Sequence, residues 1–230
     1  MGTKMKGKAI IGISMAAIMI VSVLAATVPM VGAASRGDNF NYILKMQPAQ
    51  KVLIGQNLQF VGFTGTVTVS RLVSGDVKNV YTTDAKNQIY NVNWPTSGAY
   101  YVAYNTADQA QLLVEEPVMP LELKVGTKEV STIALGTKLT IDTGGMNLFP
   151  EDQVELVING PDGQIKYDVV NYQKFTDITV AALNNKYGAS NLETAGWTIG
   201  AYTFKVKTDD VQACGLKTES VVKPLGATVK

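Results

Sequence analysis

The sequence predicts an all-β fold of two tandem immunoglobulin-like β-sandwich modules, with one short helix inserted in the second. Two observations carry this prediction. Short runs rich in Val, Ile, Tyr, Phe and Thr recur between clusters of Gly, Asn, Asp and Pro, which is typical of sandwiches and barrels. Two sequence signatures also occur in the same order in each half of the chain, which indicates a duplicated module.

Residues 1–34 are expected to be a secretory signal peptide. Three lysines precede a charge-free apolar run over residues 9–28, and small residues then lead to a cleavage site after Ala34. The run is also long enough to span a bilayer, so a retained anchor is the alternative. Cleavage removes three of the 20 basic side chains and none of the 19 acidic ones. We expect no membrane anchor afterwards, because no second apolar run is long enough to span a bilayer.

The first module is expected over residues 35–116. Its boundary follows from the segment 115–121, where Pro117 and Pro120 interrupt the strand pattern, since proline cannot donate to a sheet ladder. Six strands are predicted in this module, over residues 51–54, 57–63, 66–73, 88–94, 99–105 and 110–116.

The second module is expected over residues 117–230. The turn-forming segment NGPDGQ, residues 159–164, predicts a hairpin. Apolar residues at helical spacing predict a helix within 176–188, capped at its start by Thr176 or Asp177 and closed by Gly188. Strands are predicted over residues 121–126, 137–142, 152–160, 164–170 and 202–208.

The repeated signatures predict how each core is filled. WPTSGAYYVAYNTAD, residues 94–108, parallels WTIGAYTFKVKTDD, residues 197–210, and IGQNLQF, residues 54–60, parallels LGTKLTI, residues 135–141. Each glycine before Ala-Tyr allows a backbone turn into a strand, and each tryptophan is a large core residue. Alternation then places one set of residues in each half on a shared face: Tyr100, Val102 and Tyr104, and Tyr202, Phe204 and Val206.

The composition excludes several functional classes. The chain has no histidine, which excludes Ser-His-Asp and Cys-His catalysis and histidine-ligated metals. Its single cysteine excludes an internal disulfide framework and Cys-cluster sites. A net charge of +1 without a basic block argues against a nucleic acid as partner. We therefore expect no enzyme activity, no cofactor and no metal site.

One enzyme-like motif remains. LTIDTGG, residues 139–145, resembles the Asp-Thr-Gly segment of aspartic proteases, in which two carboxyl groups share a proton. The matching segment of the first half, residues 59–63, has no aspartate. A dimeric protease in which Asp142 is supplied twice is the remote alternative, and a strand end before a Gly-Gly turn is the preferred interpretation.

A long stretch of low charge favours assembly. The 27 residues from Gln88 to Val114 contain one charged side chain, Asp108, and the window 98–105 is aromatic, β-prone and uncharged. An exposed segment of this kind pairs readily with other strands. Core filling explains alternate residues but not the low charge of the opposite face. The predicted contact residues are Tyr100, Tyr101, Val102, Ala103, Tyr104, Leu112 and Leu113.

Cys214 is a lone cysteine in a chain expected to be exported. The flanking Gly215 and nearby charges suggest a partly exposed thiol, which could form a disulfide between two chains. A buried strand residue is the alternative.

Several of these segments resemble surface proteins of methanogenic archaea. The residues that carry the resemblance are the paired tryptophan and Gly-Ala-Tyr strands, the junction EEPVMPLELKVG (115–126) and GTKLTIDTGGMNLFPEDQVELVINGPDGQ (136–164). They are similar to the tandem β-sandwich modules of surface-layer and sheath proteins, and most like the sheath protein of filamentous methanogens. The resemblance implies an extracellular subunit of the cell envelope that polymerises with itself.

The sequence thus favours a secreted structural subunit that assembles through β edges and low-charge faces, with other copies and other envelope proteins as partners. The alternative is a secreted module that binds a carbohydrate or a protein. Its aromatic platform would comprise Tyr81, Tyr90, Trp94, Tyr100, Tyr101 and Tyr104.

Overall fold

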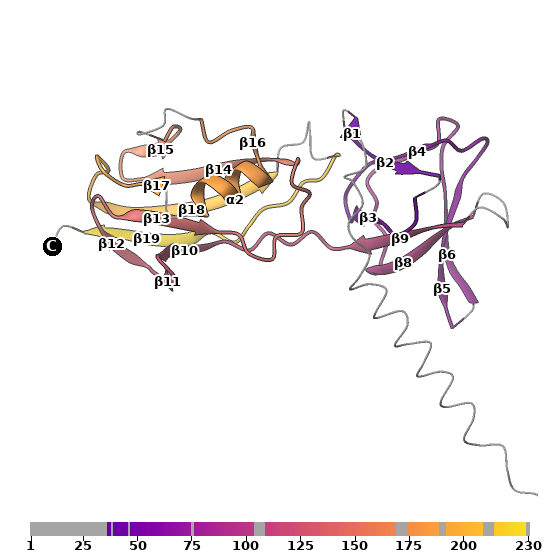
Figure 1. Cartoon of the computed structure of the whole chain (residues 1–230), viewed down its shortest axis with the longest axis horizontal. Helices are drawn as coiled ribbons and strands as arrows, with labels where there is room; N and C mark the ends of the chain where they lie inside the picture. Colours follow the sequence, from indigo (N-terminus) through magenta and orange to yellow (C-terminus); the bar gives the residue numbers. More distant parts are fainter. Residues whose placement is uncertain are drawn as a thin grey trace, which may run out of the picture. The chain divides into compact units, whose positions relative to one another are not determined.

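The computed structural model describes residues 36–37, 39–45, 47–74, 76–103, 109–168, 174–188, 192–208 and 214–228. The predicted signal peptide lies outside the described residues and stays a prediction. Every described helix and strand falls between Arg36 and Thr228. Figure 1 shows module 1 in indigo to magenta (β1–β9) and module 2 in pink to yellow (β10–β19). The described chain is β-structured except for one short helix, as predicted.

Module 1 consists of a four-stranded and a five-stranded sheet. Side chains from both sheets form one hydrophobic core, which includes Ile43, Leu58, Val69, Tyr100 and Leu112. The five-stranded sheet has the order β3 (Gln50–Leu53), β9 (Gln109–Glu115), β8 (Gly98–Ala103), β5 (Thr68–Val73) and β6 (Asp76–Thr82). The other sheet has the order β1 (Arg36–Gly37), β2 (Phe40–Leu44), β4 (Leu58–Val61) and β7 (Gln88–Ile89).

Module 2 has its own core, to which both sheets and the helix α2 (Val180–Tyr187) contribute. One sheet has the order β12 (Thr132–Ala134), β19 (Lys223–Thr228), β18 (Gly200–Thr208), β14 (Gln153–Gly160) and β15 (Gly163–Ile165), and β16 (Ile178–Thr179) also pairs with β14. The other has the order β11 (Lys128–Glu129), β10 (Glu122–Val125), β13 (Lys138–Asp142) and β17 (Leu192–Glu193).

The two modules share one strand plan. In module 1, β3 runs parallel to β9, which is followed by antiparallel β8, β5 and β6. In module 2, β12 runs parallel to β19, which is followed by antiparallel β18, β14 and β15. The opposite sheets match only in part: β4 pairs antiparallel with β7 as β13 does with β17, but β2 runs parallel to β4 whereas β10 runs antiparallel to β13. This is the arrangement of an immunoglobulin-like sandwich, and the prediction of the fold class is confirmed.

The repeated signature builds the same aromatic pair in each core. Trp94 stacks on Tyr100 and Trp197 on Tyr202, each with ring centroids 4.6 Å apart. The Tyr100 hydroxyl donates to the Thr96 carbonyl at 2.8 Å, and the Tyr202 hydroxyl to the Thr198 carbonyl at 2.5 Å. This is the tyrosine corner of immunoglobulin-like domains. Burial raises the pKa of both phenols, so both stay protonated donors.

Glycine is needed where each of these strands begins. Gly98 has φ +135° and Gly200 has φ +157°, a region that other residues rarely adopt. A Cβ on Gly200 would also collide with the ring of Pro161 in the β14–β15 turn. The predicted hairpin over 159–164 is confirmed, because Gly160 pairs with Gly163 around that turn.

Some elements differ from the predictions. The strand expected over 88–94 ends at Ile89, since Asn91 has φ +48° and leaves the extended conformation. The helix begins at Val180 with Thr179 as N-cap, where its side chain accepts from the Ala182 amide at 3.1 Å. Asp177, with φ +57°, precedes the short strand β16 instead of capping the helix. Strand β16 lies where the helix was predicted to begin, and the strands that fall outside every predicted range are β1, β2, β6, β11, β12, β17 and β19.

Removing the tyrosine hydroxyl from either corner should lower the stability of the fold by a similar amount. Tyr100→Phe and Tyr202→Phe each remove one hydroxyl while keeping the ring stack, so each is expected to lower the free energy of unfolding by about 1 kcal/mol. Urea unfolding followed by tryptophan fluorescence measures this, because each corner contacts a tryptophan. Tyr42→Phe, outside the two corners, is the control, and an equal loss there would contradict the role of the corners.

Candidate assembly surface

The structure divides the predicted contact residues between two faces of one sheet. Tyr100, Val102 and Leu112 are fully buried in the core of module 1. They cannot contact a neighbouring molecule while the module is folded, so their assignment as assembly contacts is wrong. Successive residues of a strand point to opposite faces, and these three lie on the inner one. Tyr104 lies outside the described residues.

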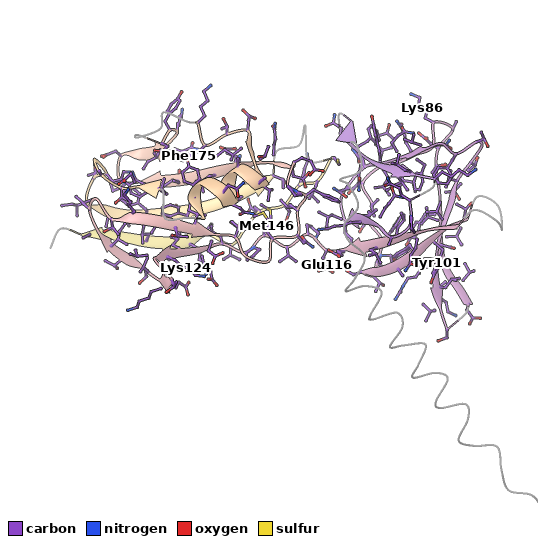
Figure 2. All side chains as sticks on the ribbon, viewed as in Figure 1. Lys86, Tyr101, Glu116, Lys124, Met146 and Phe175 are labelled. Atoms are coloured by element: carbon purple, nitrogen blue, oxygen red, sulfur yellow. The ribbon has the colours of Figure 1, made fainter. Side chains whose placement is uncertain are left out.

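The remaining residues lie on the opposite side of this sheet, which we name the module 1 outer face. Tyr101 and Leu113 are half-buried there, and strand register places Ala103 on the same side. Figure 2 labels Tyr101 in module 1. The register positions of this face are Val80, Ser70, Tyr101 and Gln111 in one row, Thr82, Thr68, Ala103 and Gln109 in a second, and Ala99 with Leu113 in a third.

None of these positions carries a charge. The nearest charged positions are Lys51, which is paired with Leu113 across β3 and β9, and Glu115, which lies two residues beyond Leu113 on the same face of β9. The two side chains lie 3.9 Å apart and are 13% and 46% exposed, and the Lys51 ammonium also donates to the Asn147 carbonyl and lies 5.0 Å from the centre of the Phe149 ring. The module 1 outer face therefore presents uncharged polar, aromatic and aliphatic groups over its central positions, with the Lys51–Glu115 pair at one end.

The equivalent face of module 2 is charged. Thr203 and Lys205 occupy the positions of Tyr101 and Ala103 in the shared strand plan. Lys205 pairs with Glu219 at 2.8 Å, and Lys207 pairs with Glu155 at 2.6 Å. The same fold thus carries solvated ion pairs at the central positions of this face in module 2 and uncharged residues at those positions in module 1.

The low-charge window is not at a sheet edge, which corrects the expectation that it pairs directly with other strands. Residues 98–103 form β8, which is hydrogen-bonded between β9 and β5. The open edge on that side of the sheet is β6, which the sequence did not reveal. Leu72, Val77 and Val80 in the β5–β6 hairpin are 40%, 57% and 57% exposed, and they form an apolar group beside this edge.

Cys214 is fully buried, which corrects the expectation of a partly exposed thiol. Its backbone is in the left-handed region at φ +53°, and its carbonyl accepts from the Asn57 amide at 2.5 Å. Leu216 nearby packs in one hydrophobic cluster with Leu53 from β3. A disulfide between two chains would require this segment to open, so the proposed cross-link is not available to the folded chain.

The thiol of Cys214 should therefore react with a thiol reagent such as DTNB only after unfolding. In native buffer we expect modification at least about a hundredfold slower than in 6 M guanidinium, because a buried thiol reacts through opened states. Non-reducing electrophoresis should show no dimer. Rapid labelling of the folded chain would contradict this.

Asp142 lies at the end of β13 in an ion pair rather than in a carboxyl pair. Its carboxylate accepts a hydrogen bond from the ammonium of Lys124 and another from the Gly144 amide at 2.7 Å. The same ammonium also pairs with Glu122 at 2.8 Å. The Lys124 side chain holds the pKa of Asp142 below its ordinary value. Two carboxyls that share a proton have one raised pKa, so this environment argues against a protease role.

The lowered pKa of Asp142 predicts how stability depends on pH. The ion pair stabilises the fold above the unfolded pKa of Asp142, near 3.8, and the contribution is lost as the pH falls through the lower folded pKa. Asp142→Asn keeps an acceptor for Gly144 and is expected to cost at most about 1 kcal/mol at pH 7, since the pair is partly exposed. In urea unfolding the difference should shrink as the pH falls below 3.8. A difference that stays the same at every pH would contradict the ion-pair role.

The proposed aromatic platform is mostly internal. Trp94 and Tyr100 are buried, and Tyr81 stacks on Trp94 with ring centroids 4.8 Å apart. Tyr90 is exposed and meets the edge of Phe40 at 5.4 Å instead of joining this stack. The aromatic groups therefore do not form one flat surface for a sugar.

Within the described part of the chain, no three acidic or cysteine side chains gather in a way that could hold a metal ion. Nor does any described helix have the length and apolar character that crossing a membrane requires.

Comparisons with known proteins find similar structures but assign the chain to no family. No family model matches the chain, and no curated protein matches it significantly. The fibronectin(III)-like modules of Clostridium thermocellum CbhA are similar with a TM-score of 0.24 and 13% identity, over 80% of this chain and 91% of theirs. Tandem Ig domains of titin are similar with a TM-score of 0.23 and 6% identity, over 80% and 96%. The fold assignment therefore rests on the strand order of this chain itself.

Proposed function

We propose that the chain is a secreted structural subunit that assembles with other copies of itself into an extracellular sheath or surface-layer lattice. The observation that supports the proposal is that the central positions of the module 1 outer face carry no charge, whereas the equivalent positions of module 2 carry ion pairs. The resemblance of the sequence to surface proteins of methanogenic archaea gives the kind of assembly.

Burial of the module 1 outer face is favourable because its central positions carry no charged groups, and charged groups are the ones that are costly to remove from water. Covering an unpaired charge costs several kcal/mol, whereas aliphatic and aromatic surface gains about 25 cal/mol per Å² on burial. Interface centres are accordingly poor in charged residues and rich in tyrosine. Tyr101 and Leu113 lie on the module 1 outer face. The ammonium of Lys51, the residue paired with Leu113, is bound to the Asn147 carbonyl.

The charged face of module 2 directs assembly to module 1. The Lys205–Glu219 and Lys207–Glu155 pairs remain solvated unless a partner supplies matching charges. A chain with one uncharged and one charged face therefore associates through a defined surface rather than through either module at random.

Module 2 supplies the substitutions that test the proposal. Tyr101→Thr with Ala103→Lys gives module 1 the residues that module 2 carries as Thr203 and Lys205. The mature chain, residues 35–230, should form ordered sheets or tubes in electron microscopy. The double variant should need at least about tenfold more protein to assemble, equivalent to 1.4 kcal/mol per contact.

The matched control is Ala85→Lys, which adds the same charge at an exposed turn of module 1. It should assemble like the unmodified chain, and circular dichroism should show all three proteins folded. Normal assembly of the double variant would contradict the assignment of this face. A monomer that binds a glycan or envelope protein saturably would support the binding-module alternative instead.

A further inference from the structure

We propose that module 1 binds an uncharged polysaccharide through a second surface, the outer side of its four-stranded sheet. Two glutamines flanked by aromatic rings would contact the sugar. We name these residues the aromatic–amide cluster: Phe40, Tyr42, Gln59, Gln88 and Tyr90. This binding goes beyond self-assembly, which is proposed for the module 1 outer face on the other sheet.

Strand register brings the cluster together. The inward residues of β2 and β4, such as Ile43 and Leu58, are fully buried, so the alternate residues lie on the outer side of the sheet. Tyr42 of β2 is paired with Gln59 of β4, and Gln59 with Gln88 of β7, which makes one row across three strands. Figure 1 shows β2 and β4 above β8 and β9 in module 1, and both sheets contribute to the core between them. Their outer sides are therefore separate surfaces.

A chain of hydrogen bonds holds the two amides of this row. The Tyr90 hydroxyl donates to Gln88 Oε1 at 2.7 Å, and Gln88 Nε2 donates to Gln59 Oε1 at 2.6 Å. Gln59 Nε2 donates in turn to the Lys86 carbonyl at 3.0 Å. A side-chain amide has two N–H groups, and contacts with the described residues use one of those of Gln88, so the other can donate to a ligand. Groups that are held before the ligand arrives lose less entropy on binding.

Tyr90 places an exposed ring beside these amides. The residue is 58% exposed, and its ring meets the Phe40 ring edge to face, with centroids 5.4 Å apart and an interplanar angle of 70°. Phe40 and Tyr42 are half-buried on the same side of β2. A pyranose has C–H groups on its ring faces and hydroxyl groups around its rim, so it can lie against an aromatic ring while its hydroxyls bond an amide. The cluster offers both kinds of contact.

The charge of this surface identifies an uncharged polymer as the occupant. An anionic or a cationic polymer is bound by groups of opposite charge. The nearby Lys45 and Lys86 lie in turns beyond β2 and before β7, and the Asp84 carboxylate in the second turn accepts from the Gln88 backbone amide at 2.8 Å. The outward positions of the sheet carry no charge: Phe40, Tyr42, Leu44, Gln59, Val61 and Gln88.

Biolayer interferometry on immobilised dextran, laminarin, xyloglucan and galactomannan tests the proposal. Residues 35–230 are used at concentrations below those at which the chain assembles, with anionic polygalacturonate for comparison. At least one neutral polymer should bind, and more tightly than polygalacturonate. Tyr90→Ala should weaken this binding at least about tenfold, because it removes both the ring and the donor to Gln88. Tyr167→Ala is the matched control, since it removes a tyrosine that is 50% exposed in module 2, and it should bind normally.

Gln88→Glu tests the amide row without changing its shape. A carboxylate cannot donate to Gln59 Oε1 and places a charge on the surface, so binding should again weaken at least about tenfold. Gln164→Glu adds the same charge at an exposed position of β15 in module 2 and should bind normally. Circular dichroism should show all four variants folded.

Failure of every neutral polymer to bind, tighter binding of polygalacturonate, or normal binding by Tyr90→Ala and Gln88→Glu would overturn the proposal. Loss of self-assembly in Tyr90→Ala would assign this surface to a second copy of the chain and would overturn it as well.

Electron microscopy of the same proteins separates this inference from the proposed function. Ordered lattices from a chain that binds no neutral polysaccharide would overturn only the sugar site. Binding that depends on Tyr90 in a chain that never assembles would support the site and contradict the structural role.

Discussion

The fold of each module depends on one buried aromatic contact, the stack of a tryptophan on the tyrosine that opens the central strand. Ring stacking of this kind contributes roughly 0.5–1.5 kcal/mol beyond area burial, and the tyrosine hydroxyl also fixes the backbone four residues upstream. Trp94 with Tyr100 and Trp197 with Tyr202 repeat the geometry closely, with interplanar angles of 30° and 29°. Because the contact fixes where β8 and β18 begin, it also fixes which residues of those strands face outward.

The faces that result are free to differ once the inner residues are set. In β8 the outward positions carry Tyr101 and Ala103, while in β18 they carry Thr203 and Lys205. One sandwich plan therefore carries uncharged central positions on this face in module 1 and ion pairs in module 2. The difference in these outward positions leaves the tryptophan–tyrosine stack of each core unchanged.

The sequence predicted the central strands of each sandwich, although it missed β2 and β19, which also contribute core residues. The duplicated Gly-Ala-Tyr strands, the 159–164 hairpin and the inserted helix follow from alternation, turn residues and helical spacing, and all are present. Strand β6 escaped prediction because Asp76, Lys78 and Asn79 make it as polar as a loop. Edge strands are often polar for this reason, so composition conceals the strands that can meet another molecule.

The candidate site was predicted only in part, for the same physical reason. Low charge over Gln88–Val114 pointed to the sheet that carries the candidate face, but alternate residues of one strand belong to different faces. Of the predicted contact residues, the outer positions are Tyr101, Ala103 and Leu113. Cys214 is buried where its carbonyl accepts from the Asn57 amide and where Leu216 joins a hydrophobic cluster with Leu53, and both Asn57 and Leu53 are distant in sequence. No local pattern around residue 214 reports them.

An extended lattice requires more than one kind of contact. The proposed contact through the module 1 outer face would supply one of them, and a closed symmetric contact through it would leave propagation to a second surface. Because the Cys214 thiol is buried, it offers no covalent link between folded chains, so a lattice of this chain would depend on many repeated non-covalent contacts.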